Sequence, residues 1–104
     1  MPTYLMLSTL TDEGRRTLKD NPERLDAVNE EIRAMGALVR SQYAVLGGYD
    51  FVNVIEAPSN EVVANISHEL ESRGTIRVTA LPAMAVNEFV LMMCARNTDA
   101  DSGG

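Results

Sequence analysis

The sequence contains few of the residues on which catalytic and metal-binding sites are commonly built. Its 104 residues include one histidine, one cysteine and no tryptophan. A single cysteine cannot form an internal disulfide, and it is compatible with a reducing compartment. One histidine and one cysteine fall short of the ligands of a zinc site, and they argue against a Ser-His-Asp or Cys-His nucleophile. The sequence therefore predicts no metal and no cofactor, and it identifies no catalytic residue.

Basic residues are also scarce. Nine lysines and arginines stand against fifteen aspartates and glutamates, so the net charge is −6. This balance argues against binding to a nucleic acid backbone or to an anionic membrane surface. No apolar run approaches the roughly 20 residues of a membrane span, and the N-terminus lacks the basic and apolar blocks of a signal peptide. We expect a cytoplasmic protein with neither nucleic acid nor membrane as a partner.

Two weaker metal-site hypotheses involve the histidine and the sulfur-containing residues. A haem held by His68 is conceivable, but helical spacing from Ile66 places His68 nearly opposite the buried side, where it is solvated. Met92, Met93 and Cys94 are soft ligands of the kind that Cu(I) prefers. Adjacent positions on a helix do not converge on one ion, so packing is the favoured interpretation.

The length and the hydrophobic pattern predict one small domain of mixed class. Apolar runs predict strands at Tyr4–Leu10, Ala37–Leu46, Tyr49–Glu56 and Thr75–Leu81. Helical spacing predicts a helix in two pieces, Asp12–Lys19 and a segment starting at Asn21-Pro22, and then helices at Glu61–Arg73 and Val86–Ala95. Right-handed crossovers convert the order β-α-β-β-α-β into an α+β, ferredoxin-like split β-α-β fold with a four-stranded antiparallel sheet and an extra C-terminal helix. We assign residues 1–96 to this domain and expect residues 97–104 to be a disordered polar tail.

One face of this predicted sheet has nothing in the chain to cover it. The runs Tyr4–Leu10 and Phe51–Ile55 are too apolar for that face to remain in water. A second copy, packed sheet against sheet, would cover it. The last helix is apolar nearly all round at Phe89–Met93, and we expect it to lie against a neighbouring subunit. The predicted partner is therefore the protein itself, as a homodimer or a higher homo-oligomer.

The stretch between the two central strands carries a family resemblance. The residues Leu46-Gly47-Gly48-Tyr49-Asp50 and Glu56-Ala57-Pro58 resemble the GYD-domain family of small bacterial and archaeal proteins. The resemblance extends to Met1–Tyr4, Thr11-Asp12, Pro22–Leu25 and Val78–Leu81. It implies a dimeric α+β barrel of ferredoxin-like topology, but no mechanism, because the family has no established activity. The Met-rich segment after Phe89 and the acidic tail depart from the family.

Alternation along the strands nominates a set of polar residues for ligand binding. If Val39 and Tyr43 face the helices, neighbouring positions face the open side, and Asn53 or Glu56 joins them according to the parity of its strand. The full predicted ligand-binding set is Arg40, Gln42, Tyr49, Asp50, Asn53, Arg77 and Thr79. The ligand would be a small anionic or carbonyl-bearing molecule, held by Arg40 or Arg77. Salt bridges between subunits, or solvation at the interface edge, would satisfy the same residues.

The Gly-Gly-Tyr-Asp turn admits two interpretations. In the structural one, Gly47-Gly48 forms a two-residue hairpin turn, Tyr49 packs over it, and Asp50 bonds nearby backbone amides. In the functional one, Tyr49 and Asp50 form a rim that contacts a ligand or the partner subunit. A lone aspartate beside a turn is not a general base unless its surroundings raise its pKa.

Three functions fit these observations. The leading hypothesis is a homo-oligomeric small-molecule-binding or regulatory module with its pocket between the sheets of two subunits. The alternative is a cofactor-independent enzyme, an isomerase or oxygenase, which requires Asp50, Tyr43 or Arg40 to line a closed cavity. The third is a purely structural assembly protein, in which side chains alone fill that face.

Overall fold

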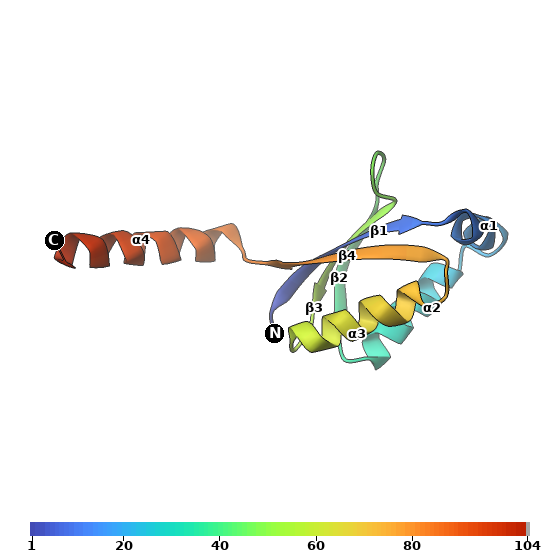
Figure 1. The fold of residues 1–104 in the computed structure, drawn as a ribbon, viewed down its shortest axis with the longest axis horizontal. Helices are drawn as coiled ribbons and strands as arrows, with labels where there is room; N and C mark the ends of the chain where they lie inside the picture. Colours follow the sequence, from blue (N-terminus) through green and yellow to red (C-terminus); the bar gives the residue numbers. More distant parts are fainter. Residues whose placement is uncertain (104) are drawn as a thin grey trace.

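The computed structural model describes the backbone of residues 1–103 and the side chains of residues 1–97. The elements follow in the order β1 (Thr3–Leu10), α1 (Asp12–Asp20), α2 (Arg24–Ala34), β2 (Leu38–Ala44), β3 (Phe51–Glu56), α3 (Asn60–Glu71), β4 (Ile76–Ala83) and α4 (Val86–Gly103). The strands form one antiparallel sheet in the order β2-β3-β1-β4, with α2 and α3 on one face (Figure 1). The predicted α+β, ferredoxin-like fold with a C-terminal helix is confirmed.

The core lies between this sheet and the helices. Side chains at alternate positions of β1 and β3 point toward the helices, as the strand period of two requires. They pack against apolar residues of α2 and α3, and the buried cluster includes Tyr4, Met6, Ile55, Ile32, Val63, Ile66 and Leu70. The other alternate positions, including Leu5 and Val54, are half-buried and lie on the open face. Within one chain, β1 is therefore fully buried on one face only.

Strand β2 contains an irregularity that the sequence pattern did not reveal. Its pairing with β3 shifts register between Val39 and Ser41, so Arg40 is an extra residue, as in a β-bulge. A one-residue shift moves every later side chain to the opposite face. Gln42 consequently pairs with Asn53 on the helix side, and Tyr43 lies on the open face with 60% of its surface exposed. The predictions that Tyr43 faces the helices and that Gln42 faces the open side are wrong.

The connection between β2 and β3 is longer than the predicted two-residue turn. Beyond the ends of β2 and β3, Val45 N–H donates a hydrogen bond of 2.9 Å to the Asp50 carbonyl oxygen. Residues 46–49, which lie between these two, form the tip of the hairpin. Gly47 adopts φ +118°, a backbone conformation that side chains disfavour. Figure 1 shows this hairpin projecting beyond the sheet. The Gly-Gly pair thus shapes an extended loop rather than a tight turn.

The helix starts follow local capping chemistry. Thr11 caps α1 by accepting a hydrogen bond from Gly14 N–H at 3.1 Å, and Ser59 caps α3 by accepting one from Val62 N–H at 3.3 Å. Helix α2 begins at Arg24 and not at Pro22, because the preceding residues form a turn closed by Arg24 N–H and the Asn21 carbonyl oxygen. The chain therefore enters α2 later than the Asn-Pro pair indicates.

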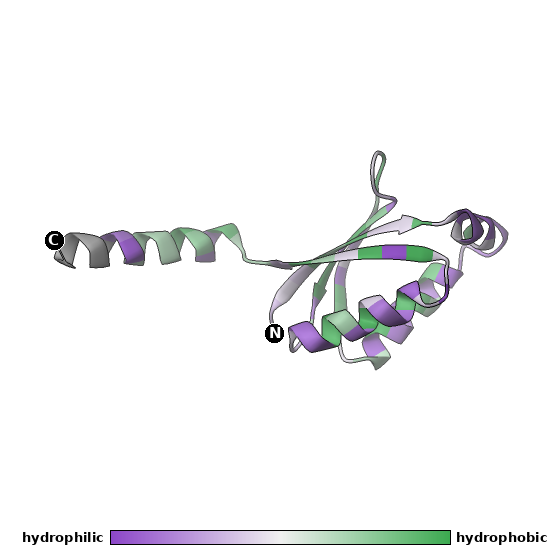
Figure 2. Cartoon of the chain, viewed as in Figure 1, coloured by the Kyte–Doolittle hydropathy of each residue, from purple (hydrophilic) through white to green (hydrophobic). Residues whose placement is uncertain are grey.

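Helix α4 stands away from the rest of the domain (Figure 1). The chain as a whole, with α4 included, measures 63 × 29 × 19 Å along its principal axes. The first half of α4 is apolar (Figure 2), and Leu91 is 68% exposed, with Phe89, Val90 and Met92 also exposed. The predicted polar tail, residues 97–104, lies almost entirely outside the described side chains and remains a prediction. Within the part of the chain that the structure describes, none of the helices combines the length and hydropathy needed to cross a bilayer.

Candidate functional site

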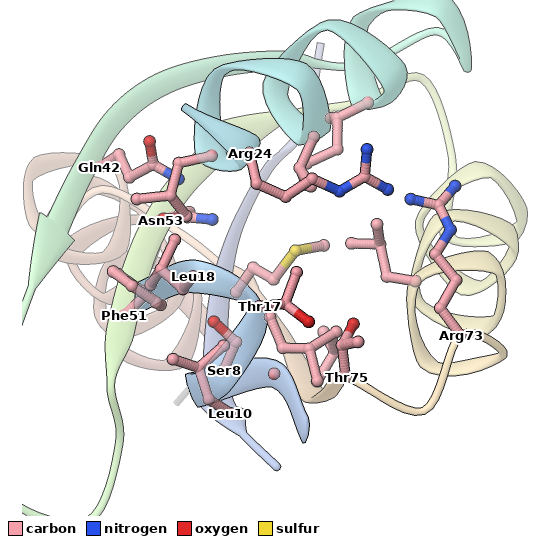
Figure 3. Close-up of a pocket in the computed structure, with 18 residues that line it drawn as sticks. Ser8, Leu10, Thr17, Leu18, Arg24, Gln42, Phe51, Asn53, Arg73 and Thr75 are labelled. Carbon is pink, nitrogen blue, oxygen red and sulfur yellow. The ribbon is translucent and has the colours of Figure 1, made fainter. Parts of the chain in front are cut away.

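A mainly apolar cavity lies on the helix side of the sheet, not on its open face. Its volume is about 330 Å³, and all four strands and helices α1, α2 and α3 contribute to its wall (Figure 3). Most of the lining is apolar, with Met6, Phe51 and Val78 from the strands and Leu18, Leu25 and Val28 from the helices. Such a volume is near the lower end of small-molecule sites, which span roughly 300–1,000 Å³.

Two polar strand residues, Asn53 and Gln42, lie together in this cavity (Figure 3). Asn53 is only 6% exposed, and its Oδ1 is fully buried with no hydrogen-bond partner among the residues that the structure describes. Gln42 is satisfied: it exchanges two hydrogen bonds with Asn29 of α2, one of 2.9 Å from Asn29 Nδ2 and one of 3.2 Å to Asn29 Oδ1. Asn53 is therefore the polar group of this wall that still requires a donor.

Two arginines from different elements flank the same cavity, and their guanidinium groups point toward each other (Figure 3). Arg73 forms ion pairs with Glu31 and, at 3.6 Å, with Glu69. Arg24 Nη2 lies 4.0 Å from Glu31 Oε1, which is too long for a hydrogen bond. Arg73 is held in place, whereas Arg24 keeps its donors for another acceptor.

The structure divides the predicted ligand-binding residues among three places. Gln42 and Asn53 line the cavity. Arg77 and Thr79 lie on the open face of β4, opposite Thr9 and Leu7 of β1. The remaining three, Arg40, Tyr49 and Asp50, lie at the edge of the sheet or in the β2–β3 hairpin. The set therefore does not form one site within a single chain.

The hairpin aspartate has a structural partner. Asp50 Oδ2 accepts a hydrogen bond of 2.8 Å from Leu10 N–H, and it lies 3.7 Å from Arg15 Nη2. The bond to a backbone amide agrees with the structural interpretation of Asp50, and the contact with Arg15 also connects the loop to α1. Tyr49, in contrast, is exposed beside it. Asp50, Tyr43 and Arg40 are not among the residues that line the helix-side cavity, and the enzyme hypothesis, which places its cavity between two subunits, stays a prediction.

Several cavity residues were missed by the sequence reasoning. None of the polar lining residues Ser8, Thr17, Arg24, Arg73 and Thr75 belongs to the predicted ligand-binding set. One signal was available, because Ser8 is a polar residue on the buried parity of an otherwise apolar strand, where it is 3% exposed. His68 is exposed, as predicted.

These features define a small α+β protein of ferredoxin-like topology with a mainly apolar cavity between its sheet and its helices. The sequence model of the GYD domain matches residues 4–93, and the chain therefore belongs to the GYD-domain family. It is also similar to a protein of Thermus thermophilus named glutamine synthetase and cystathionine beta-lyase binding protein. The two are 50% identical over 91 residues, which span 86% of this chain and 96% of the relative.

Proposed function

We propose that this protein is a regulatory binding module whose partners are enzymes, with glutamine synthetase and cystathionine beta-lyase as the first candidates. The observation that carries the proposal is the similarity to a relative named for binding those two enzymes. The two sequences are 50% identical, and the match spans 96% of the relative's length.

The β2–β3 hairpin offers a contact surface for such a partner. It projects from the sheet (Figure 1), and its tip carries a fully exposed Leu46 and an exposed Tyr49. Tyrosine is enriched among the residues that contribute most of the binding energy of protein interfaces, and Leu46 adds exposed apolar surface beside Tyr49. The loop is also tied to β1 through Asp50, so little ordering is required when it docks.

The open face of the sheet and helix α4 support self-association. The half-buried Leu5, Leu7, Val52 and Val54 share the open face, with Tyr43 and Leu81 more exposed beside them. We propose that a second copy covers this face and that α4 packs against a neighbouring subunit, because an apolar helix that stands alone in water is only marginally stable.

The test is direct binding between purified proteins. Glutamine synthetase and cystathionine beta-lyase from the same organism are immobilised, and binding of the full chain is followed by biolayer interferometry. We expect saturable binding to at least one enzyme and none to an unrelated enzyme of similar charge. The variant Leu46→Ser/Tyr49→Ser should weaken binding at least about tenfold, which corresponds to about 1.4 kcal/mol.

The matched control is Glu61→Ser, an exposed position on α3. It should leave binding unchanged. If the wild-type chain binds neither enzyme when it is present at about 100 μM, any dissociation constant is weaker than that value and the proposed function is refuted. Equal losses in both variants would refute the hairpin as the contact surface.

A further inference from the structure

The cavity between the sheet and the helices has the features of a binding site that the proposed function does not use. It lies on the helix side of the sheet, opposite the face proposed for self-association, so a second copy packed on the open face would not contact the strand residues that line it. Its walls come from the strands and helices of one chain, and no partner is required to complete it. The chemistry of its lining indicates what it holds.

The first indication is the unpartnered Asn53 Oδ1. Leaving a buried acceptor without a hydrogen bond costs about 1–3 kcal/mol, so buried polar groups normally have a partner. Asn53 is held in the middle of β3, between Met6 and Gln42 on the neighbouring strands, and its side-chain amide points into the cavity (Figure 3). A hydroxyl or amino group of a ligand would supply the missing donor.

The second indication is Arg24. Its guanidinium flanks the cavity from α2, its side chain is 44% exposed, and its nearest carboxylate oxygen is 4.0 Å away on Glu31. The Glu31 carboxylate is already paired with Arg73. A guanidinium with donors available beside an apolar cavity fits a carboxylate, which accepts two parallel N–H bonds from it.

The third indication is the apolar remainder of the wall. Leucine, valine, isoleucine, methionine and phenylalanine side chains provide most of it, and burial of an apolar body there is favourable at about 25 cal/mol per Å². The volume of about 330 Å³ suits a small molecule and excludes a large cofactor.

From these three observations we propose that the cavity binds a small carboxylic acid with an apolar body and one hydroxyl or amino group. The body packs against the aliphatic and aromatic wall, the donor bonds Asn53 Oδ1, and the carboxylate bonds Arg24. The proposal is independent of enzyme binding, so either can fail without the other.

The test uses three matched probes and the ¹⁵N-labelled full chain. The probes are 3-(4-hydroxyphenyl)propanoate, 3-phenylpropanoate, which lacks the donor, and 3-(4-hydroxyphenyl)propanamide, which lacks the charge. Backbone and Asn53 side-chain amide shifts are followed by NMR. We expect the hydroxy acid to shift resonances of cavity residues and to bind about tenfold tighter than either analogue.

Variants then assign each preference to a residue. Asn53→Leu is close in shape and should remove the preference for the hydroxyl, and Arg24→Met should remove the preference for the carboxylate. Arg33→Met, an exposed arginine on the same helix, is the control and should retain both. If Asn53→Leu does not fold, Val28→Phe fills the cavity and should abolish binding of all three probes.

Two results would overturn the proposal. One is that none of the probes shifts the cavity resonances at about 10 mM, a concentration at which even a dissociation constant of about 1 mM would give nearly full occupancy. The other is equal binding of the hydroxy acid and 3-phenylpropanoate to the wild-type chain. That result would mean that water donates the hydrogen bond to Asn53 Oδ1 and that a hydroxyl group on the ligand adds nothing to affinity.

Discussion

Arg40 Nη2 lies 2.8 Å from Glu56 Oε2 and donates a hydrogen bond to it, joining the bulge of β2 to the last residue of β3. The hydrogen bond from Arg40, and secondarily its charge, hold the pKa of Glu56 below its usual value, and the same contact raises the pKa of Arg40. Arg40, predicted as a clamp for a ligand, is therefore already paired within its own chain.

The Arg40–Glu56 pair predicts a defined pH dependence of stability. Because the folded state lowers the pKa of Glu56, its contribution is fully present above the unfolded pKa of a glutamate, about 4.3, and is lost as the pH falls through the folded pKa. Melting temperatures of the wild type and Glu56→Gln are compared from pH 7 to pH 3. The wild type should be slightly more stable at neutral pH, and the difference should vanish in acid.

The control for this series is Glu30→Gln on the exposed side of α2. Its difference from the wild type should not change sign or disappear over the same range. A wild-type advantage that grows as the pH falls would contradict the assigned direction. The effect should also shrink at high salt, since both side chains are solvent-accessible.

Asp50 should stabilise the fold mainly through the hydrogen bond that its Oδ2 accepts from Leu10 N–H. Asp50→Ala removes the acceptor of Leu10 N–H and should cost about 1–2 kcal/mol in urea unfolding, whereas Asp50→Asn keeps an acceptor and should cost less. Unchanged stability in both variants, accompanied by lost enzyme binding, would instead place Asp50 in the contact surface. The two substitutions therefore separate the structural interpretation from the functional one.

Gly14 of α1 lies directly against the chain that leads into β4. A Cβ added at Gly14 would lie 1.9 Å from the Thr75 carbonyl oxygen, which also accepts a hydrogen bond from Thr11 N–H. Backbone atoms cannot move aside as the end of a side chain does, so Gly14→Ala should cost about 3 kcal/mol or prevent folding. Thermal unfolding measures this loss.

Gly48→Ala is the matched control, because nothing lies within 4 Å of a Cβ built there. It should change the free energy of unfolding by less than about 0.5 kcal/mol, as is usual for surface substitutions. Similar stability of the two variants would show that α1 approaches β4 less closely than the structure has it.

The open face predicts the assembly of the protein. Val54 is half-buried at the centre of that face, so Val54→Lys should place a charge in the interface between two copies. Light scattering after size exclusion should give an oligomeric mass for the wild type and a monomeric mass for the variant. Ala64→Lys, exposed on α3, should retain the wild-type mass. A monomeric wild type would refute self-association.

The strands and helices were largely predictable because their signals are local. The apolar runs of β1 and β3, the spacing of Val63, Ile66 and Leu70 on α3, and the Ser59 cap each arise from residues a few positions apart. The start of α2 was misplaced because a proline preference at a first helical turn is weaker than the turn that Asn21 and Arg24 form.

The face of each side chain was less predictable. The bulge at Arg40 reverses the parity of β2 after Val39, and nothing in the alternation of that strand marks it. It moves Gln42 beside Asn53 and so brings two residues of the predicted ligand-binding set into one cavity, on the opposite face from the one predicted.

The sequence by itself determined the fold class, the order of the elements and the family, because hydrophobic period, caps and turn residues act over short distances along the chain. It also determined the acidic charge and the shortage of catalytic and metal-binding residues. Only the tertiary structure decided which polar groups share a wall, that Asn53 Oδ1 lacks a partner among the described residues, and that Arg24 and Arg73 face each other. Those relationships depend on sheet register and on how helices close over the sheet, which are set by packing between distant segments.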